Sequence, residues 1–267
     1  MGGLDWYLAD DESGRASRRE RTMATIVVGD IHANLGPLND LLGQLRSVVD
    51  EKDVVVFLGD YIDRGSDAKG CIDALLQFQE EVPARVRYLC GNHEAWLLRT
   101  LGDFRKHSWL LGMEAFETIR SYSPHGADTL RAAAAAEGPR LVLDDCALPY
   151  EEFLTHVPES HIRFLQGLLP SWRTEYGLCV HGGLDPDGSR LEDQPREALL
   201  WGAEGFPERY RGSEIVVYGH RNNAEIDSTG WPHPRRIGPT IGVDTIAHGV
   251  LTALRLPDQR VLQSARW

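Results

Sequence analysis

The chain lacks any apolar run long enough to cross a membrane. Its 267 residues contain no apolar stretch that approaches the roughly 20 residues that a spanning helix requires. The first 11 residues are acidic and lack the basic start and apolar body of a signal peptide. A myristoylation signal is missing as well, because Trp6 stands where that signal requires Ser or Thr. We therefore expect a cytoplasmic protein that has no membrane partner.

Cysteine and clustered positive charge are also scarce. The 4 cysteines form no CxxC pair, and Cys90 and Cys179 fall inside expected buried strands, so we expect reduced thiols in the core. The net charge of −12 argues against nucleic acid as a partner, because neutralising its backbone requires clustered Lys and Arg. An anionic substrate must therefore be attracted by metal ions and a few arginines.

The composition is that of one globular domain. Hydrophobic residues make up 42% of the chain and charged residues 25%, both ordinary values. Residues 1–22 are polar with mixed charge, so we expect a flexible N-terminal extension there. We expect the remaining residues, 23–267, to form a single domain and the protein to be a monomer.

Five short apolar runs each end in a glycine-flanked cluster of Asp, Asn or His. They are 26–28 before GDIH, 54–58 before GDYIDRG, 86–90 before GNHE, 178–180 before HGG and 215–218 before GH. Short β-branched runs are typical of buried strands, and α/β proteins bind ligands beyond the carboxyl ends of their strands. We therefore expect the five clusters to converge in space.

Together the clusters supply ligands for two metal ions. The candidate ligands are Asp30, His32, Asp60, Asn92, His181 and His220. Hard divalent ions such as Mn²⁺, Mg²⁺ or Fe²⁺ prefer this mixture of carboxylate, amide and imidazole groups. Asp60 could bridge two such ions, which can deprotonate a shared water, and the hydroxide then attacks phosphorus without a protein nucleophile.

Three further residues of these clusters fit acid catalysis and phosphate binding. His93 adjoins Asn92, so it should face the site and could protonate the departing alkoxide. A neighbouring carboxylate such as Asp63 would raise the pKa of this imidazole and fix its tautomer. Arg64 offers a planar fork for phosphate oxygens.

The ordered set GDIHAN, GDYIDRG, GNHE, HGG and GH resembles the phosphoprotein phosphatase (calcineurin-like) family of metallophosphoesterases, in particular its bacterial serine/threonine phosphatase branch. The similarity is collinear from about residue 24 to 263 and includes the Leu200-Trp201 and Asp244-Thr245 pairs. It implies an α/β fold, a four-layer αββα sandwich of two mixed sheets flanked by helices. It also implies hydrolysis of phosphomonoesters, often phosphoserine and phosphothreonine.

The resemblance distributes the six ligands over two divalent ions, most often Mn²⁺, with Fe, Zn, Ni or Mg as alternatives. It assigns Asp30 and His32 to the first ion and makes Asp60 the bridge between the ions. Asn92, His181 and His220 are assigned to the second ion. The resemblance makes His93 the general acid oriented by Asp63. Arg64, Asn92 and one further arginine are expected to bind the phosphate.

Three departures from the family pattern concern the substrate side of the site. Ala33 replaces the usual glycine after His32. The sequence at 201–203 reads Trp-Gly-Ala where bacterial relatives have Trp-Ile-Arg, so the second phosphate-binding arginine is missing there. Arg209, Arg211 or Arg221 could replace it, and Arg221 is our tentative choice. The third departure is Arg221 after His220, where relatives tend to have Thr or a similar small residue. We read 221–239, which contains Trp231, as an inserted loop that shapes substrate choice.

Helical patterns fill the remaining sequence. Apolar residues recur at helical spacing after His32 and after Gly65, which indicates a βαβ start. Between about 95 and 172 we expect an insertion lying over or beside the site, with helices at 96–101, 109–119, around 132–136 and from Pro158 to 169.

Three functions compete for this sequence. The first is a metal-dependent phosphomonoesterase that acts on phosphoproteins or small phosphate esters. A dinucleoside polyphosphate or nucleotide hydrolase would use the same fold and metals, with Trp231 as a platform for a base. A scaffold without catalysis would predict eroded ligands, whereas all six ligands and His93 are present.

Overall fold

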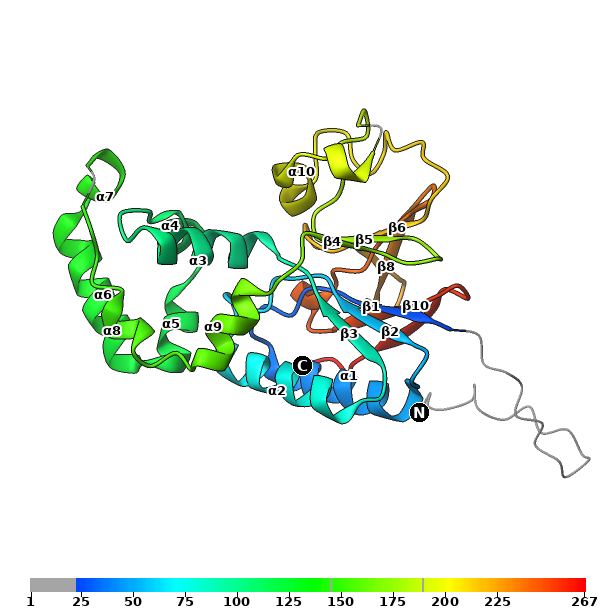
Figure 1. Ribbon diagram of the computed structural model, residues 1–267, viewed down its shortest axis with the longest axis horizontal. Coiled ribbons are helices and arrows are strands. Elements are labelled where there is room, and N and C mark those ends of the chain that lie inside the picture. The colour runs from blue at the N-terminus through cyan, green and yellow to red at the C-terminus, as the bar shows by residue number, and fades with distance from the viewer. Residues whose placement is uncertain (1–22, 145, 189) are drawn as a thin grey trace, which may run out of the picture.

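The computed structural model describes residues 23–144, 146–188 and 190–267, so the expected flexible extension at 1–22 lies outside the described residues. Two mixed β-sheets stack against each other with helices on their outer faces (Figure 1). This architecture confirms the expected α/β sandwich. Within the described residues, no helix has the length and apolar character needed to cross a membrane.

The first sheet holds the N-terminal strands and the C-terminal hairpin. Its order is β11-β10-β1-β2-β3. The strands are β1 (Thr25–Val28), β2 (Val54–Phe57), β3 (Arg85–Tyr88), β10 (Thr252–Leu256) and β11 (Arg260–Gln263). β1, β2 and β3 run parallel, while β10 pairs antiparallel with β1. The carboxyl ends of β1, β2 and β3 therefore lie at one edge, where their three clusters follow.

The second sheet is formed by residues from 171 to 242. Its order is β4-β5-β6-β9-β8-β7. The strands are β4 (Ser171–Arg173), β5 (Leu178–Val180), β6 (Val216–Tyr218), β7 (Ala224–Ile226), β8 (Pro232–Ile237) and β9 (Thr240–Gly242). β5, β6 and β9 are parallel to one another. Their carboxyl ends present the HGG and GH clusters toward the first sheet.

Alternation along the strands divides the core into two layers. Val27 and Val56 face the second sheet and pack with Val217 of β6, whereas Val55 and Phe57 face the helices. Those helices are α1 (Leu35–Val48) and α2 (Ala68–Glu81), which lie along the outer face of the first sheet (Figure 1). Both match the expected helical spacing.

The helical segment between β3 and β4 lies beside the sheets (Figure 1). It comprises α3 (Asn92–Gly102), α4 (Ser108–Gly112), α5 (Phe116–Tyr122), α6 (Pro124–Glu137), α7 (Arg140–Leu143), α8 (Glu151–Leu154) and α9 (Glu159–Gln166). The expectation of one helix over 109–119 is wrong. The backbone breaks between α4 and α5, where Glu114 has a left-handed φ of 56°, a conformation that ends a right-handed helix.

The segment at 221–239 is a β-hairpin and not a plain loop. β7 and β8 pair antiparallel and extend the second sheet. Trp231 sits in the turn, where its Nε1–H donates to Oε1 of Gln263 at 2.7 Å and the Arg266 guanidinium lies 5.0 Å from its ring. Trp231 is therefore anchored to the C-terminal residues, which argues against a free platform for a base.

Three smaller elements complete the described chain. α10 (Arg196–Trp201) covers the outer side of the second sheet, and two short 3-10 turns, η1 (Leu191–Asp193) and η2 (Ile246–His248), lie in the connections. All 4 cysteines are free thiols, and Cys90 is buried although β3 ends two residues before it.

Candidate active site

The five clusters meet where the parallel strands of the two sheets end. Several of their residues have a left-handed backbone that side chains other than glycine rarely adopt. The φ angles are 46°, 52°, 68°, 66° and 59° for His32, Asp60, Asp63, Arg64 and His220, respectively. Such strained residues gather at functional sites, because the strain persists only where the surrounding structure holds it in place.

The first group of candidate ligands surrounds one oxygen of Asp60. Oδ2 of Asp60 lies 3.5 Å from Nε2 of His32 and 3.9 Å from Nε2 of His93. The ligand atoms of these three residues lie within 4.8 Å of one another. Asp30 is slightly farther out, with Oδ2 at 3.9 Å from Nε2 of His32.

The second group surrounds the other oxygen of Asp60. It joins Asp60 with His181 and His220, again within 4.8 Å. Nε2 of His181 lies 3.4 Å from Oδ1 of Asp60 and 2.8 Å from Oδ1 of Asn92. Asp60 therefore lies between the two groups, as expected of a bridging carboxylate.

Backbone carbonyls orient two of the imidazoles. Nδ1 of His181 lies 3.1 Å from the carbonyl oxygen of Leu58, and Nδ1 of His32 lies 3.3 Å from that of Ile62. When Nδ1–H donates to a carbonyl, Nε2 carries the lone pair. Metal-binding histidines are commonly held in this way by a partner behind the ring.

Charge and burial at the two groups fit divalent cations. Burial lowers the pKa of His32 to about 3, and burial together with His181 lowers the pKa of His220 to about 3, so both rings are neutral and able to act as ligands. Burial raises the pKa of Asp60, but His181 and His93 outweigh it and hold that pKa well below its usual value. Oδ2 of Asp60 is buried and has no hydrogen-bond partner among the described residues. A cation would satisfy this oxygen.

His93 and Asp63 form a buried pair beside these groups. Nδ1 of His93 lies 2.8 Å from Oδ2 of Asp63, and both residues are at most 1% exposed. Burial lowers the pKa of His93, but Asp60 and Asp63 outweigh it and raise that pKa above its ordinary value. Nε2 of His93 is buried without a partner in the described chain, so it is available to a substrate.

Two residues of the helical segment hold the Asp63 carboxylate. Trp109 of α4 donates from Nε1 to Oδ2 at 2.8 Å, and Thr118 of α5 donates from Oγ1 to Oδ1 at 2.6 Å. The Thr118 oxygen also accepts from the Asp63 backbone N–H at 2.8 Å. Burial raises the pKa of Asp63, while the hydrogen bonds from His93, Thr118 and Trp109 oppose that rise. The sequence patterns gave no signal for either contact.

Glu94 organises the loop that carries the bridging carboxylate. Its two oxygens accept four backbone N–H groups, from Asp60 at 2.9 Å, Tyr61 at 2.8 Å, Ile62 at 3.3 Å and Gly91 at 3.1 Å. Glu94 is fully buried. It ties the GDYIDRG loop to the GNHE loop, a role that the last letter of the GNHE motif could have suggested.

Asp244 is a further buried carboxyl at the site. Its Oδ2 accepts from the backbone N–H of Asn222 at 2.6 Å, and its Oδ1 has no partner among the described residues. Burial raises its pKa to about 6, with a contribution from Asp60. Asp244 follows β9 as the five clusters follow their strands, so the same sequence signal could have identified it.

Arg64 lies at the exposed rim of the first group. Its Nη1 contacts Nε2 of His32 at 2.9 Å, the nitrogen that a cation in this group would use. The Arg64 side chain is exposed, so the guanidinium can reach both the ligands and a substrate.

The position of Arg221 distinguishes it from the other two candidate arginines. Its Nη2 donates to the carbonyl oxygens of Trp201 at 2.6 Å and Gly202 at 3.2 Å. The guanidinium thus lies beside the segment in which relatives carry the missing arginine. In contrast, Arg209 forms an ion pair with Asp187 at 2.5 Å, and Arg211 donates to backbone carbonyls of its own loop.

Comparison with known proteins finds a family match and relatives named as phosphatases. A family model described as calcineurin-like phosphoesterase matches residues 23–249. A probable serine/threonine-protein phosphatase of Encephalitozoon cuniculi is 36% identical over 217 residues, which cover 76% of this chain and 43% of that protein. Serine/threonine-protein phosphatase PP1-1 of Saccharomyces cerevisiae is 27% identical over 192 residues, which cover 71% and 47%. The chain thus spans about half the length of these relatives.

Solved structures share the fold at low sequence identity. A putative diadenosine tetraphosphatase superposes with a TM-score of 0.57 and 19% identity, covering 91% of this chain and 94% of that one. The cold-active protein-tyrosine phosphatase of a psychrophilic Shewanella species superposes with a TM-score of 0.52 and 14% identity, covering 90% and 77%. The family match extends over most of the chain and over all five clusters, and the chain therefore belongs to the calcineurin-like phosphoesterase family.

Proposed function

We propose that this protein is a metal-dependent phosphomonoesterase of the serine/threonine protein phosphatase type. The observation that carries the proposal is the pair of ligand groups that share Asp60, together with the His93 and Asp63 pair next to them. The relatives named as serine/threonine phosphatases support the substrate class.

The residues of the chain divide the chemistry between them. Asp63 holds the imidazole of His93 so that Nε2, which has no partner in the described structure, can give its proton to the departing alkoxide oxygen. Arg64 and Arg221 bind the non-bridging phosphate oxygens through their planar guanidinium groups. Asn92 places its Oδ1 2.8 Å from Nε2 of His181, so the two atoms could share a cation, and it adds an amide at the phosphate position.

The ligand set would hold two divalent ions, for which we propose Mn²⁺. When bound, these ions would lower the pKa of a water molecule and polarise the phosphoryl oxygens. The imidazole, carboxylate and amide donors suit Mn²⁺ or Fe²⁺, and no thiolate is among them. Zn²⁺, Ni²⁺ and Mg²⁺ are the alternatives to compare. A cytoplasmic location and a monomeric state stay predictions from the sequence.

The test is metal-dependent turnover of three substrates in parallel. Purified protein is stripped with a chelator, and Mn²⁺, Mg²⁺, Zn²⁺ or Ni²⁺ is added back. We expect turnover of a chromogenic aryl phosphate and of a phosphothreonine peptide, with little turnover of a dinucleoside tetraphosphate. Preference for the dinucleotide would move the assignment to nucleotide hydrolysis, and inactivity on all three with metal bound would support a scaffold.

The variant His93→Asn distinguishes a general acid from a metal ligand at this position. His93 lies within reach of the first ligand group, so its geometry suits either role. We expect His93→Asn to retain two ions per chain by elemental analysis and to lose turnover by a factor of about 10² or more. Loss of one ion in this variant would make His93 a ligand instead.

A further inference from the structure

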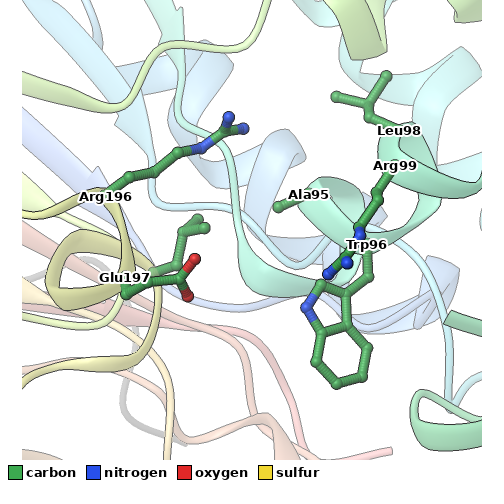
Figure 2. Close-up of a pocket in the computed structure, with 7 residues that line it drawn as sticks. Ala95, Trp96, Leu98, Arg99, Arg196 and Glu197 are labelled. Carbon is green, nitrogen blue, oxygen red and sulfur yellow. The ribbon is translucent and has the colours of Figure 1, made fainter. Parts of the chain in front are cut away.

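A pocket opens beside the candidate active site between α3 and α10. Its volume is about 330 Å³, and it is lined by Ala95, Trp96, Leu98, Arg99, Arg196, Glu197 and Leu200. Figure 2 shows Trp96 and Arg99 on the α3 side and Arg196 and Glu197 on the α10 side. Both helices adjoin the site, since α3 begins at Asn92 and α10 ends at Trp201.

Aromatic packing connects this pocket to the metal ligands. The Trp96 ring lies 5.3 Å from the Trp201 ring, and Trp201 lies edge-on to His220 at 5.5 Å. Trp96 of the pocket is therefore connected to His220 through the Trp201 ring. Along α3, Arg99 comes six residues after His93, which is about 9 Å of helix. An extended peptide covers this distance in about three residues.

Two arginines supply the positive charge of the pocket. Within the residues that the structure describes, neither Arg99 nor Arg196 forms an ion pair, although Arg196 reaches the thiol of Cys90. Both arginines are exposed. The chain carries a net charge of −12, so two guanidinium groups facing one pocket are a local feature that would attract an anion.

We propose that this pocket is an anion-binding subsite, which takes a side-chain carboxylate of a peptide substrate about three residues from the phosphorylated residue. The proposal rests on the proposed phosphatase function and deepens it. Arg99 and Arg196 hold the carboxylate, and Trp96 packs against the peptide. Arg99, Arg196 and Glu197 together carry one net positive charge. That charge balances one carboxylate, whereas Glu197 would repel a polyphosphate that carries several negative charges.

The test compares matched phosphothreonine peptides. A single Glu is moved through the positions two to four residues on either side of the phosphothreonine, and each peptide is paired with its Gln counterpart. For the wild type we expect the kcat/KM ratio of Glu to Gln peptide to reach about fivefold at one position, the size typical of exposed charge pairs. The ratio should fall as ionic strength rises.

Protein variants locate the effect in the pocket. Arg99→Gln and Arg196→Gln should each bring the ratio close to one. Arg163→Gln is the matched control, because it removes the same charge from a surface pair with Glu159 on α9, and it should keep the ratio. A wild-type ratio near one at every position, or a ratio retained in both pocket variants, would overturn the subsite.

Two further outcomes separate the subsite from the proposed function. If both pocket variants slow hydrolysis of a dinucleoside tetraphosphate and leave the peptide ratio intact, the pocket serves polyphosphates and the proposal is wrong. If no phosphate ester is turned over with any metal, the proposed function fails. Fluorescence anisotropy of labelled Glu and Gln peptides then tests the subsite alone. If the Glu peptide binds wild type and Arg99→Gln with equal affinity, the subsite is refuted.

Discussion

Replacing Thr118 by valine removes two hydrogen bonds that hold Asp63 against His93. The Thr118 hydroxyl donates to Oδ1 of Asp63 and accepts from the Asp63 backbone N–H. Thr118 is 1% exposed, so water cannot replace the hydroxyl. A hydrogen bond to a charged group contributes about 2 kcal/mol and a neutral one about 1 kcal/mol. We therefore expect Thr118→Val to lower the free energy of unfolding by about 3 kcal/mol.

Thr100→Val is the matched control for this change. Thr100 is also 1% exposed, and its hydroxyl donates only to the backbone carbonyl of Lys106, at 2.6 Å. One neutral hydrogen bond is lost, so we expect the free energy of unfolding, measured with urea, to fall by about 1 kcal/mol. Equal destabilisation by the two variants would show that Thr118 does not bind a charged Asp63.

The catalytic effect of Thr118→Val should depend on the leaving group. A general acid accelerates departure of a poor leaving group, such as the threonine alkoxide, much more than that of an activated phenolate. We expect kcat for a phosphothreonine peptide to fall about tenfold and kcat for an activated aryl phosphate to fall less than about twofold. Equal losses on both substrates would refute the idea that Thr118 acts through Asp63 on the proton donor.

Asp63→Asn extends the same reasoning to pH. Burial lowers the pKa of His93, while Asp60 and Asp63 raise it. Removing one carboxylate disfavours the imidazolium, so the pKa of His93 falls and its proton is lost at lower pH. The alkaline limb of the kcat/KM profile for the phosphothreonine peptide should therefore shift down by about one pH unit. A limb that stays in place would exclude His93 as the group that titrates there.

Three further variants test the ligands, the supporting loop and the phosphate side. Asp60→Asn should lower metal content and reduce kcat about 100-fold or more, and added Mn²⁺ should raise the melting temperature of the wild type but not of this variant. Glu94→Gln places an amide N–H₂ against backbone N–H donors. We therefore expect the free energy of unfolding, measured with urea, to fall by about 3 kcal/mol, and metal binding measured by calorimetry to weaken. Arg221→Gln should raise KM for the phosphothreonine peptide about tenfold, whereas Arg209→Gln should not. The reverse result would assign the second phosphate arginine to position 209.

Local sequence patterns predicted the strands and first helices well. β1, β2, β5 and β6 match the apolar runs to within one residue. These runs predict strands because their β-branched residues fit buried positions on both faces of a sheet. The helical segment was predicted less well. Its expected helix at 109–119 is two helices, since the break at Glu114 depends on packing that no periodicity reveals.

The hairpin at β7 and β8 shows a second limit of pattern reading. The sequence pattern at 221–239 indicates an inserted loop, whereas Pro232 and Pro234 both lie within β8. Both prolines lie in the half of β8 that pairs with β7 alone, because β9 pairs with residues 235–237. A proline there can lack its N–H donor, since one side of that half has no strand partner. The turn of this hairpin also places Trp231 against Gln263, which lies 32 positions away in the sequence.

The amino-acid sequence by itself determined the types of the candidate ligands and their meeting point. Parallel strands bring their carboxyl ends to one edge, so any cluster that follows such a strand must arrive there. Only the tertiary structure decided which groups hold those residues. Thr118 and Trp109 reach Asp63 across 55 and 46 positions, and Arg221 reaches Trp201 across 20. Such partners are set by how helices and loops pack, and no local pattern records that packing.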